Sequence, residues 1–522
     1  MQDKAAVDSE LLRAFEREVL SKAPHLEGGR VVKESPMLDL TQALRDCANE
    51  EFELDLSNTQ FTLYGKLDGS LPGGSIKQRP AIQIVREAIA SGRLRRGQVV
   101  FEATSGNFGI ALGAMGKLGL DVVVLVSRRL EQGVLDELGK SGVKMVDLEV
   151  DVCPAPGVQM DPNVLLARIV AGKIRERFSE LGLDLGVSDE TKEDIEGTLA
   201  RQDVINLAKV LARAYGGFCP EQYDNEDNLE AHEEITGPEI DQQLREIGHS
   251  LDGCGVVCTF GTGGSSGGLS RYVQGKYGKK AVHLVFPAEG QDVAGIRNKS
   301  KAMGLRFYEP ERYAGEHEVD FGQARRLFGF MVERGYDIGE SSALALYAVV
   351  QMVNFGVEGK FVVILADGAA KYRRTMEAAK QEDEKEEGME VTLDGARARL
   401  ARYGGVVWTH MGYVPTAEGV KVIANALGLP EEKVRVADPS DVVRLVSTQE
   451  VTPALRKVLD GKEGSKRRAL LVCMSGNTSL RASQVLESKG FKAQSLTGGI
   501  TRLAAASRKP LPTLVAPAKQ KA

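Results

Sequence analysis

Short apolar runs alternate with amphipathic stretches over the first two thirds of the chain. Three closely spaced runs have the length and composition of buried strands, at Val99–Thr104, Asp121–Ser127 and Val143–Leu148. Helical patterns separate them, at 109–118 and 130–140. Strands that alternate with helices pair in parallel, so the pattern predicts a layered α/β fold.

The same alternation returns further along the chain. Strand-like runs occur at Cys254–Phe260, Ala281–Phe286 and Phe361–Ala366. Between the two groups of strands, residues 162–216 combine helical apolar spacing with many charges, which predicts a helical insertion that covers or flanks a cleft. We therefore assign residues 1–380 to one large α/β domain that carries this insertion.

A charged segment follows this domain. Residues 381–390 (QEDEKEEGME) have almost no apolar positions, which is typical of a linker. Residues 391–505 again alternate strand-like and helical patterns, so we expect a second α/β domain there. The last segment, 506–522, is rich in Pro, Ala and Lys, and we predict a mobile tail.

Composition narrows the function classes. Apolar residues are 42% and charged residues 27% of the 522, as in globular proteins. The net charge of −6 argues against a nucleic-acid partner, and no apolar run of about 18 residues predicts a membrane span. Charges interrupt the first 20 residues, unlike a secretory signal, and six scattered Cys fit the reducing cytoplasm, where we expect the protein to reside.

Glycine is enriched: 58 of the 522 residues are glycine, about 11% against a usual ~7%. The clearest cluster is Gly261-Thr262-Gly263-Gly264-Ser265, which continues through Gly268 and lies between a predicted strand and a helix expected from Leu269. Backbone N–H groups in such a loop suit a phosphate, and the spacing matches neither a P-loop nor a dinucleotide fingerprint. The alternative is a flexible structural turn.

Three further motifs carry candidate chemistry, although each alone has an ordinary structural explanation. Lys77 follows a glycine turn and opens an apolar helix, where desolvation would lower its pKa and free the amine for a Schiff base. The loop Thr104–Gly109 (TSGNFG) lies between a strand and a helix and suits an anionic oxygen. Ser341 and Ser342 stand at the start of a predicted helix, where serines commonly serve as caps.

Along the chain the order is the lysine turn, the loop with Asn107, the glycine-rich loop and the two serines. In this order the four motifs resemble those of the fold-type II pyridoxal-phosphate enzymes, in the cysteine synthase and cystathionine β-synthase branch. The run from Gln222 through His232 to Thr236–Ile240 (TGPEI) is also similar. The resemblance covers about residues 35–376. It implies two α/β subdomains around a cofactor cleft, pyridoxal 5'-phosphate as the cofactor, and a homodimer.

The resemblance assigns roles to residues. It implies that Lys77 forms the internal aldimine and acts as acid and base, that Asn107 binds the phenolic oxygen, and that Ser341, with Ser342 as the rival, binds the pyridine nitrogen. The phosphate would lie on Gly261, Thr262, Gly263, Gly264 and Ser265. The substrate carboxylate would be held by Thr104, Ser105, Gly106 and Gln222, and Phe108 would lie beside the substrate.

The implied reaction is β-replacement. An O-activated L-serine-type substrate would lose its leaving group to give an α-aminoacrylate, to which a sulfur or other nucleophile adds. The alternatives are a β-elimination lyase that releases ammonia, and a non-catalytic regulatory homologue. Phe108 replaces the usual Thr of the loop and Ala343 the usual Gly after the two serines, so we expect Phe108 to reshape substrate choice.

The second domain carries a cysteine motif. Cys473 ends the strand-like run 469–473 and precedes a helix at 480–489, where helix N–H groups would stabilise a thiolate or persulfide. The segment from Cys473 to Gly499 resembles the active loop of rhodanese-like sulfurtransferase domains, which implies a sulfur donor. The alternatives are an inactive structural domain and a tyrosine phosphatase loop, although that loop requires Arg at position 479, which is Ser. No metal site is predicted, because Cys254 and Cys258 lack a companion Cys or His motif.

Overall fold

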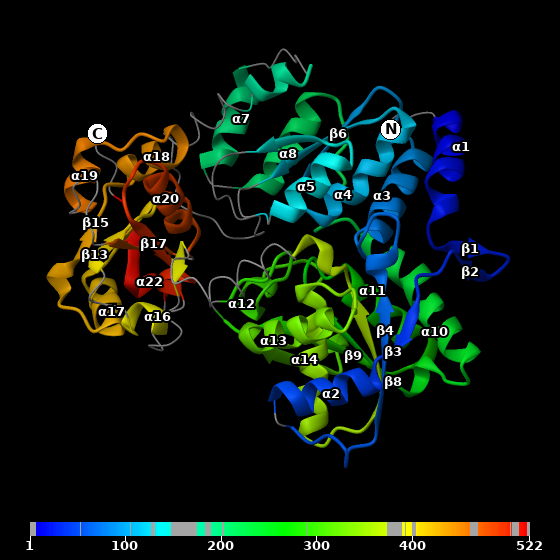
Figure 1. Cartoon of the computed structure of the whole chain (residues 1–522). Coiled ribbons are helices and arrows are strands. Elements are labelled where there is room, and N and C mark those ends of the chain that lie inside the picture. Colours follow the sequence, from blue (N-terminus) through cyan, green and yellow to red (C-terminus); the bar gives the residue numbers. More distant parts are fainter. Residues whose placement is uncertain are drawn as a thin grey trace. The chain divides into compact units, whose positions relative to one another are not determined.

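The computed structural model describes residues 7–52, 54–104, 106–126, 130, 132–147, 174, 176–182, 189–200, 203–289, 291–372, 389–391, 393–398, 403–459, 468–474, 476–501, 503 and 511–518 (Figure 1). The chain divides into two compact units, which are described separately. The first contains Met1–Val126, Leu130–Met145 and Ala208–Glu377, and the second contains Ser127–Arg129, Val146–Leu207 and Ala378–Ala522.

A six-stranded sheet forms one half of the first unit. All neighbouring strands are parallel except the last pair, which is antiparallel. The predicted strands at 254–260, 281–286 and 361–366 are confirmed to within two residues. The strand order is β10 (Gly315–Val319), β9 (Val282–Pro287), β8 (Cys254–Thr259), β11 (Gly359–Leu365), β4 (Phe61–Leu67) and β3 (Met37–Asp39).

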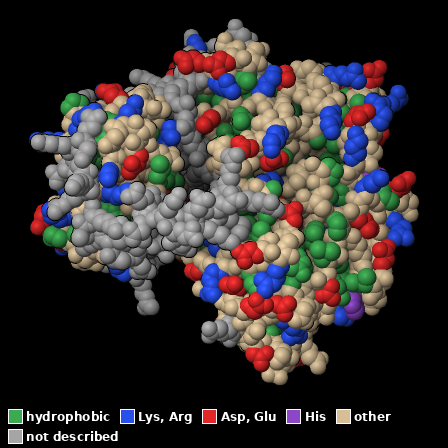
Figure 2. Space-filling model, viewed as in Figure 1, with side chains coloured by type: hydrophobic (Ala, Val, Ile, Leu, Met, Phe, Trp, Pro, Cys, Tyr) green, Lys and Arg blue, Asp and Glu red, His purple; other side chains and the backbone are tan. Residues whose placement is uncertain are grey.

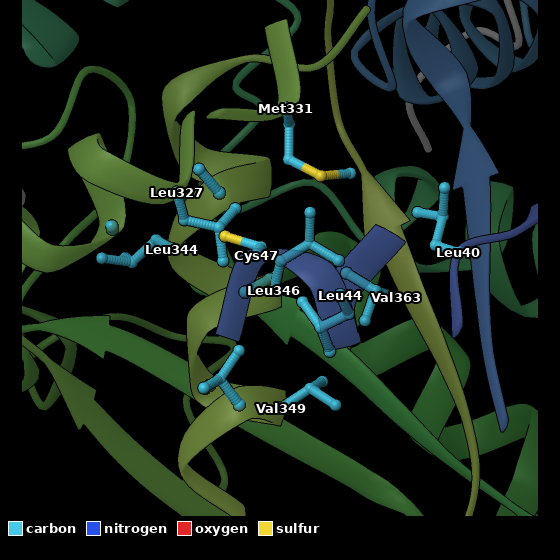
Figure 3. Packing of buried hydrophobic residues seen from close by; sticks show 14 of the residues in the cluster. Leu40, Leu44, Cys47, Leu327, Met331, Leu344, Leu346, Val349 and Val363 are labelled. Atoms are coloured by element: carbon cyan, nitrogen blue, oxygen red, sulfur yellow. The ribbon is translucent and has the colours of Figure 1, made fainter. Parts of the chain in front are cut away.

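Three helices supply the core of this half: α2 (Thr41–Phe52), α13 (Phe321–Glu333) and α14 (Glu340–Asn354). Leu44, Leu327 and Val349, one from each helix, belong to the same buried cluster as Val363 of β11 (Figure 3). Helix α14 is apolar along most of its length and is buried accordingly. This packing fixes the start of α14 at the carboxyl end of β11, where Gly339 N–H donates to the carbonyl of Asp367 at 2.9 Å.

A second, three-stranded sheet forms the other half of the first unit. Its order is β5 (Val99–Ala103), β6 (Asp121–Val126) and β7 (Lys144–Asp147), which confirms the three predicted strands. Helix α5 (Gln132–Lys140) also lies where it was predicted. The predicted helix at 109–118 is instead a short α4 (Asn107–Leu112) followed by a 3₁₀ segment. The change occurs at Gly113, where a Cβ would lie 2.5 Å from the carbonyl oxygen of Ser141.

The predicted insertion at 162–216 is described only from residue 174 onward, with gaps. Helices α7 (Asp189–Ala200) and α8 (Val204–Ala214) confirm helical structure in its second half. Within the described ranges, no helix has the length and apolar character needed to cross a membrane. Basic and acidic side chains are interspersed on the face shown in Figure 2, in keeping with the nearly balanced charge.

The second unit contains a five-stranded parallel sheet. Its order is β12 (Glu390–Val391), β17 (Ala493–Leu496), β16 (Arg468–Val472), β13 (Tyr403–Trp408) and β15 (Val434–Val436). Helices α17 (Ala417–Leu427), α18 (Pro439–Thr448) and α20 (Asn477–Ser488) alternate with the strands. The predicted α/β character of residues 391–505 is therefore confirmed for the part of this region that the structure describes.

The predicted mobile tail is wrong for residues 511–518. Helix α22 (Leu511–Leu514) leads into β18 (Val515–Pro517), which pairs antiparallel with β14 (Tyr413–Pro415). Leu514 is fully buried in the core of the second unit. A few apolar side chains anchor this segment, and their burial outweighs the Pro- and Lys-rich composition on which the prediction rested.

Candidate active site

Lys77 lies at the start of helix α3 (Gln78–Ala90), directly after a glycine turn. Gly74 has a φ of +65°, which favours glycine, and Ile76 N–H donates to the carbonyl of Ala366 at 2.7 Å. The helix buries Ile82, Val85 and other apolar residues, so its first turn is held against the domain. Burial, together with the positive charge of Arg297, lowers the pKa of the Lys77 amine to about 8.

The glycine-rich loop faces this amine. A Cβ built on Gly261 would lie 3.8 Å from Nζ of Lys77 and 2.7 Å from the carbonyl oxygen of Gly295. Gly263 has a φ of +90° and precedes helix α11 (Gly264–Tyr277). The loop therefore requires glycine both for its backbone conformation and for the space in front of Lys77.

Helix α11 begins at Gly264, five residues earlier than predicted. The glycines lie in its first turns because neighbouring groups approach the backbone closely. A Cβ on Gly264 would lie 2.0 Å from Oδ1 of Asn228, and one on Gly268 would lie 2.3 Å from the carbonyl oxygen of Leu229. The N–H groups at the start of the helix, including that of Ser265, face out of the first turn and suit a dianionic phosphate.

Asn228 connects the glycine-rich loop to Gln222. Its Nδ2 donates to the hydroxyl of Thr262 at 3.1 Å and to the carbonyl of Gln222 at 2.6 Å. The Gln222 side chain donates in turn to Oε1 of Glu102 at 3.1 Å. Burial raises the pKa of Glu102 to about 8, and its Oε2 has no hydrogen-bond partner. One N–H of the Gln222 amide is thus fixed by a buried carboxyl group, and its second N–H remains for a ligand.

The loop after β5 is organised by Thr104. Its hydroxyl oxygen accepts from the N–H groups of Gly106 at 3.0 Å and Gly109 at 3.1 Å. Gly106 has a φ of +119°, and a Cβ there would lie 2.1 Å from Val134. Ser105 lies outside the described residues. The structure therefore gives Thr104 a loop-shaping role, through hydrogen bonds of its side chain to the backbone.

Asn107, at the start of α4, is held by two side chains. Its Nδ2 donates to Oδ2 of Asp367 at 2.8 Å, and its Oδ1 accepts from Nζ of Lys371 at 2.6 Å. Asp367 follows β11 and also accepts from the hydroxyl of Tyr372 at 2.8 Å. Burial raises the pKa of Asp367 and lowers that of Lys371. The structure thus brings the loop after β5 against the loop after β11.

The two serines of α14 have different environments. The hydroxyl oxygen of Ser342 accepts from Ala366 N–H at 3.0 Å, and the residue is fully buried. Ser341 is 6% exposed, and Gly339 just before it lies against the carboxylate of Asp367. Because Ser342 is occupied by the backbone of the neighbouring strand end, the geometry favours Ser341 as the residue available to a ligand.

Phe108 does not lie where it was expected. Its side chain is 2% exposed and belongs to the hydrophobic cluster of the smaller half, together with Leu112, Val134 and Leu138. We expected the ring to lie beside the substrate. It packs in the core instead, because Phe108 occupies the first turn of α4 on the side that faces α5 and the sheet.

Several residues of this site were assigned no role from the sequence. Asp367 follows an apolar strand, which is a weak signal for a functional position in a parallel sheet. Asn228 lies within the run from Gln222 to His232 that resembles the synthases, which was a signal for it. Arg297 and Lys371 carry no recognisable local pattern, because Arg297 lowers the pKa of Lys77, and Lys371 contacts Asn107, only in the folded chain.

The cysteine motif belongs to the second unit. Cys473 follows β16, the middle strand of its sheet, and is 1% exposed. Its Sγ accepts from Gly476 N–H at 3.2 Å and from the hydroxyl of Ser479 at 3.3 Å. Gly476 has a φ of +94° and precedes α20, so the predicted turn from strand to helix is present.

The residues of the first unit fit pyridoxal phosphate. They provide an amine of lowered pKa, a backbone cradle that any Cβ at Gly261 or Gly264 would fill, an amide with one N–H to spare, and a serine at a helix start. No group of three or more potential metal-ligating side chains occurs in the part of the chain that the structure describes.

Two curated proteins and one solved structure are similar to this chain. The cysteine synthase B of Pseudomonas aeruginosa is 30% identical over 317 residues, which cover 60% of this chain and 88% of that protein. A cysteine synthase of Staphylococcus aureus is 24% identical over 351 residues, covering 66% and 97%. The crystal structure of an O-ureido-L-serine synthase aligns with a TM-score of 0.46 and 22% identity, over 65% of this chain and 90% of that one.

Residues 52–367 match the family described as pyridoxal-phosphate dependent enzymes. This range contains Lys77, the loop with Asn107, the glycine-rich loop and Ser341, and it spans more than half of the chain. The chain therefore belongs to the family of pyridoxal-phosphate dependent enzymes.

Proposed function

We propose that the first unit catalyses β-replacement on an O-activated L-serine-type substrate, with sulfide or another nucleophile as the second reactant. The observation that carries the proposal is Ser341 at the start of α14, whose neutral hydroxyl would be the partner of the cofactor's ring nitrogen. The names of the two cysteine synthases that match most of this unit support the same reaction class.

Pyridoxal phosphate, when bound, supplies the conjugated ring that accepts electron density from the substrate's Cα. The Ser341 hydroxyl would not keep the ring nitrogen protonated as a carboxylate would, which would make the ring a weaker electron sink. Such a site would favour loss of the α-proton together with the β-substituent over reactions that need a persistent carbanion. Lys77, once released from the cofactor, is the residue we assign to move the α-proton.

The remaining site residues bind and orient. The N–H groups at the start of α11, including that of Ser265, and the Thr262 hydroxyl would hold the phosphate. Asn107 would donate its second N–H to the phenolic oxygen. The loop from Thr104 to Gly106 and the second N–H of Gln222 would hold the substrate carboxylate, and the buried Glu102 keeps Gln222 in place.

The reaction assignment is tested with purified, cofactor-loaded enzyme. O-acetyl-L-serine and O-phospho-L-serine are each supplied with and without sulfide, and cysteine and pyruvate are measured together. Cysteine as the main product, with little pyruvate, supports the proposal. Pyruvate and ammonia formed at the same rate with or without sulfide would instead identify a lyase. Absence of turnover by a protein with an intact cofactor spectrum would favour a non-catalytic homologue.

For the second unit we propose a rhodanese-like domain in which Cys473 carries sulfane sulfur. The parallel sheet supports this, because Cys473 lies at the carboxyl end of its middle strand, where α/β domains place reactive groups. The hydrogen bonds from Gly476 and Ser479 to Sγ would also stabilise a thiolate. With thiosulfate, the thiolate would take the outer sulfur and sulfite would leave.

This second proposal is tested by sulfite release. The wild type should release sulfite from thiosulfate in the presence of a thiol acceptor, and Cys473→Ser should not. Cys219→Ser is the matched control, because Cys219 belongs to the first unit. Equal release by wild type and Cys473→Ser would assign the domain a structural role. The homodimer implied by the sequence resemblance also stays a proposal, to be tested by sedimentation velocity.

A further inference from the structure

Lys371 is a buried lysine next to the cofactor site, and the reaction outlined above does not use it. It ends the 3₁₀ turn η7 (Ala369–Lys371) after β11 and is 7% exposed. Its Nζ donates to Oδ1 of Asn107 at 2.6 Å and to the carbonyl of Gly74 at 2.9 Å, and lies 3.9 Å from Oδ2 of Asp367. Burying a lysine is costly unless its donors are satisfied, so this arrangement requires a compensating benefit.

The contacts fix the orientation of the Asn107 amide. An amide side chain can rotate by 180° and exchange the positions of its oxygen and nitrogen. One orientation is favoured over the other only when one neighbouring group is a donor and the other an acceptor. Here Oδ1 faces a cation and Nδ2 faces a carboxylate at 2.8 Å. The reversed orientation would point the NH₂ group at an ammonium group and the carbonyl oxygen at a carboxylate. Only one orientation is therefore compatible with both neighbours.

This orientation leaves one donor free for a ligand. The NH₂ group of Asn107 has two N–H bonds, and Asp367 accepts one of them. The second N–H is available to an anionic oxygen, such as the phenolic oxygen of pyridoxal phosphate.

Lys371 also joins Asn107 to the turn that bears Lys77. Gly74, whose carbonyl accepts from Lys371, lies three positions before Lys77. The backbone of Lys371 is itself fixed, since a Cβ on Gly133 of α5 would lie 2.3 Å from its carbonyl oxygen. One side chain thus connects the loop after β5, the lysine turn and the loop after β11.

We propose that Lys371 is a positioning residue for the cofactor: together with Asp367 it locks the amide of Asn107 so that one N–H points to the phenolic oxygen. This inference rests on the cofactor site of the proposed function, but not on the reaction that the enzyme catalyses. Lys371 acts through Asn107, and that dependence can be measured.

The test is a double-mutant cycle on cofactor affinity, read from the visible absorption as pyridoxal phosphate is titrated into cofactor-free protein. Lys371→Met should raise the dissociation constant about tenfold in the wild-type background, the effect of one charge-assisted hydrogen bond. In the Asn107→Ala background the same change should raise it less than twofold, because the residue through which Lys371 acts is gone. The visible band of Lys371→Met should also shift, since the amide of Asn107 is then no longer held in one orientation.

Two further variants keep the test decisive. Tyr372→Phe removes a hydrogen bond to the same Asp367 oxygen without touching Asn107, so it should leave the affinity within about twofold. Lys371→Gln keeps a donor for Asn107 and should recover part of the affinity if Lys371→Met fails to fold. An equal loss from Lys371→Met in both backgrounds would overturn the proposal. Because no substrate is present, a failed β-replacement assay leaves this result interpretable.

Discussion

Arg79 donates to Glu239 at 2.6 Å, and the two side chains are 2% and 0% exposed. Arg79 also makes two hydrogen bonds to Asp68, at 2.7 and 2.8 Å, and Lys66 reaches the other oxygen of Glu239 at 2.5 Å. Two cations and two carboxylates thus neutralise one another out of contact with solvent. Since Arg79 lies two positions after Lys77, this network fixes the helix turn that carries the Lys77 amine.

Replacing Arg79 should destabilise the protein strongly. Arg79→Met leaves Asp68 and Glu239 buried with one cation fewer, which should lower the free energy of unfolding by about 3–5 kcal/mol. Arg86→Met is the matched control on the same helix, because Arg86 is 43% exposed and pairs only with its neighbour Glu87. It should change stability by less than about 0.5 kcal/mol. Urea unfolding of the three proteins checks the difference, and similar values for both variants would contradict the assigned role of the network.

Capture of the cofactor should depend on the protonation of Lys77. Burial lowers the pKa of this amine from 10.5 to about 8, so the free amine, which is the nucleophile, forms as the pH rises through 8. The rate at which cofactor-free protein acquires visible absorption should therefore rise with pH and reach half its maximum near pH 8. Lys77→Ala should show neither the absorption nor turnover. A midpoint near 10.5 would mean that the amine is fully solvated.

The same pKa shift has a consequence for stability. Between pH 8 and 10.5 the unfolded chain binds a proton at Lys77 that the folded protein does not, so the free energy of unfolding should increase with rising pH in this window. Urea unfolding of cofactor-free wild type and Lys77→Ala at pH 7.5 and 9.5 measures this contribution: the stability of the wild type relative to the variant should be larger at pH 9.5. An equal stability difference at the two pH values would contradict the lowered pKa.

Gly264 should be irreplaceable for cofactor binding. In Gly264→Ala the new Cβ would lie 2.0 Å from Oδ1 of Asn228, so either the loop or Asn228 must move. We expect the dissociation constant for pyridoxal phosphate to rise at least about tenfold, the loss of one hydrogen bond to a charged group. Gly275→Ala lies on the same helix, meets no atom within 4 Å, and should bind the cofactor normally. Equal affinity of the two variants would contradict the assignment of the phosphate site.

Phe108 should act through packing. Phe108→Ala should lower the free energy of unfolding by about 3–5 kcal/mol, as for other large-to-small changes in a core. Phe108→Leu should cost less than about 1.5 kcal/mol and leave the relative kcat/KM among activated serines unchanged. If Phe108→Leu changes that selectivity while stability is preserved, the ring contacts the substrate in the working enzyme, and its burial here describes only the cofactor-free chain.

Much of the architecture follows from local sequence. The runs that became β5, β6, β8 and β11 are mostly apolar, as expected for strands buried on both faces of a layered fold. The loop with Asn107 and the glycine-rich loop follow β5 and β8, so their place at strand ends could be predicted, and Lys77 and Ser341 stand at helix starts. Local patterns suffice here because burial and backbone hydrogen bonding are decided over a few neighbouring residues.

Other features depend on contacts between distant segments. Asn107 hydrogen-bonds to Asp367 and Lys371, which are 260 and 264 positions away in the sequence, and no local pattern encodes either contact. The first turns of α11 require glycine because Asn228 and Leu229 approach the backbone, and residues 511–518 are held because Leu514 is buried in a core formed by earlier strands. The sequence alone thus determined which elements form and which chemical groups stand at their ends. Only the tertiary structure decided how those groups are oriented, since the partners and the burial of a side chain depend on segments that are distant in the sequence and come together on folding.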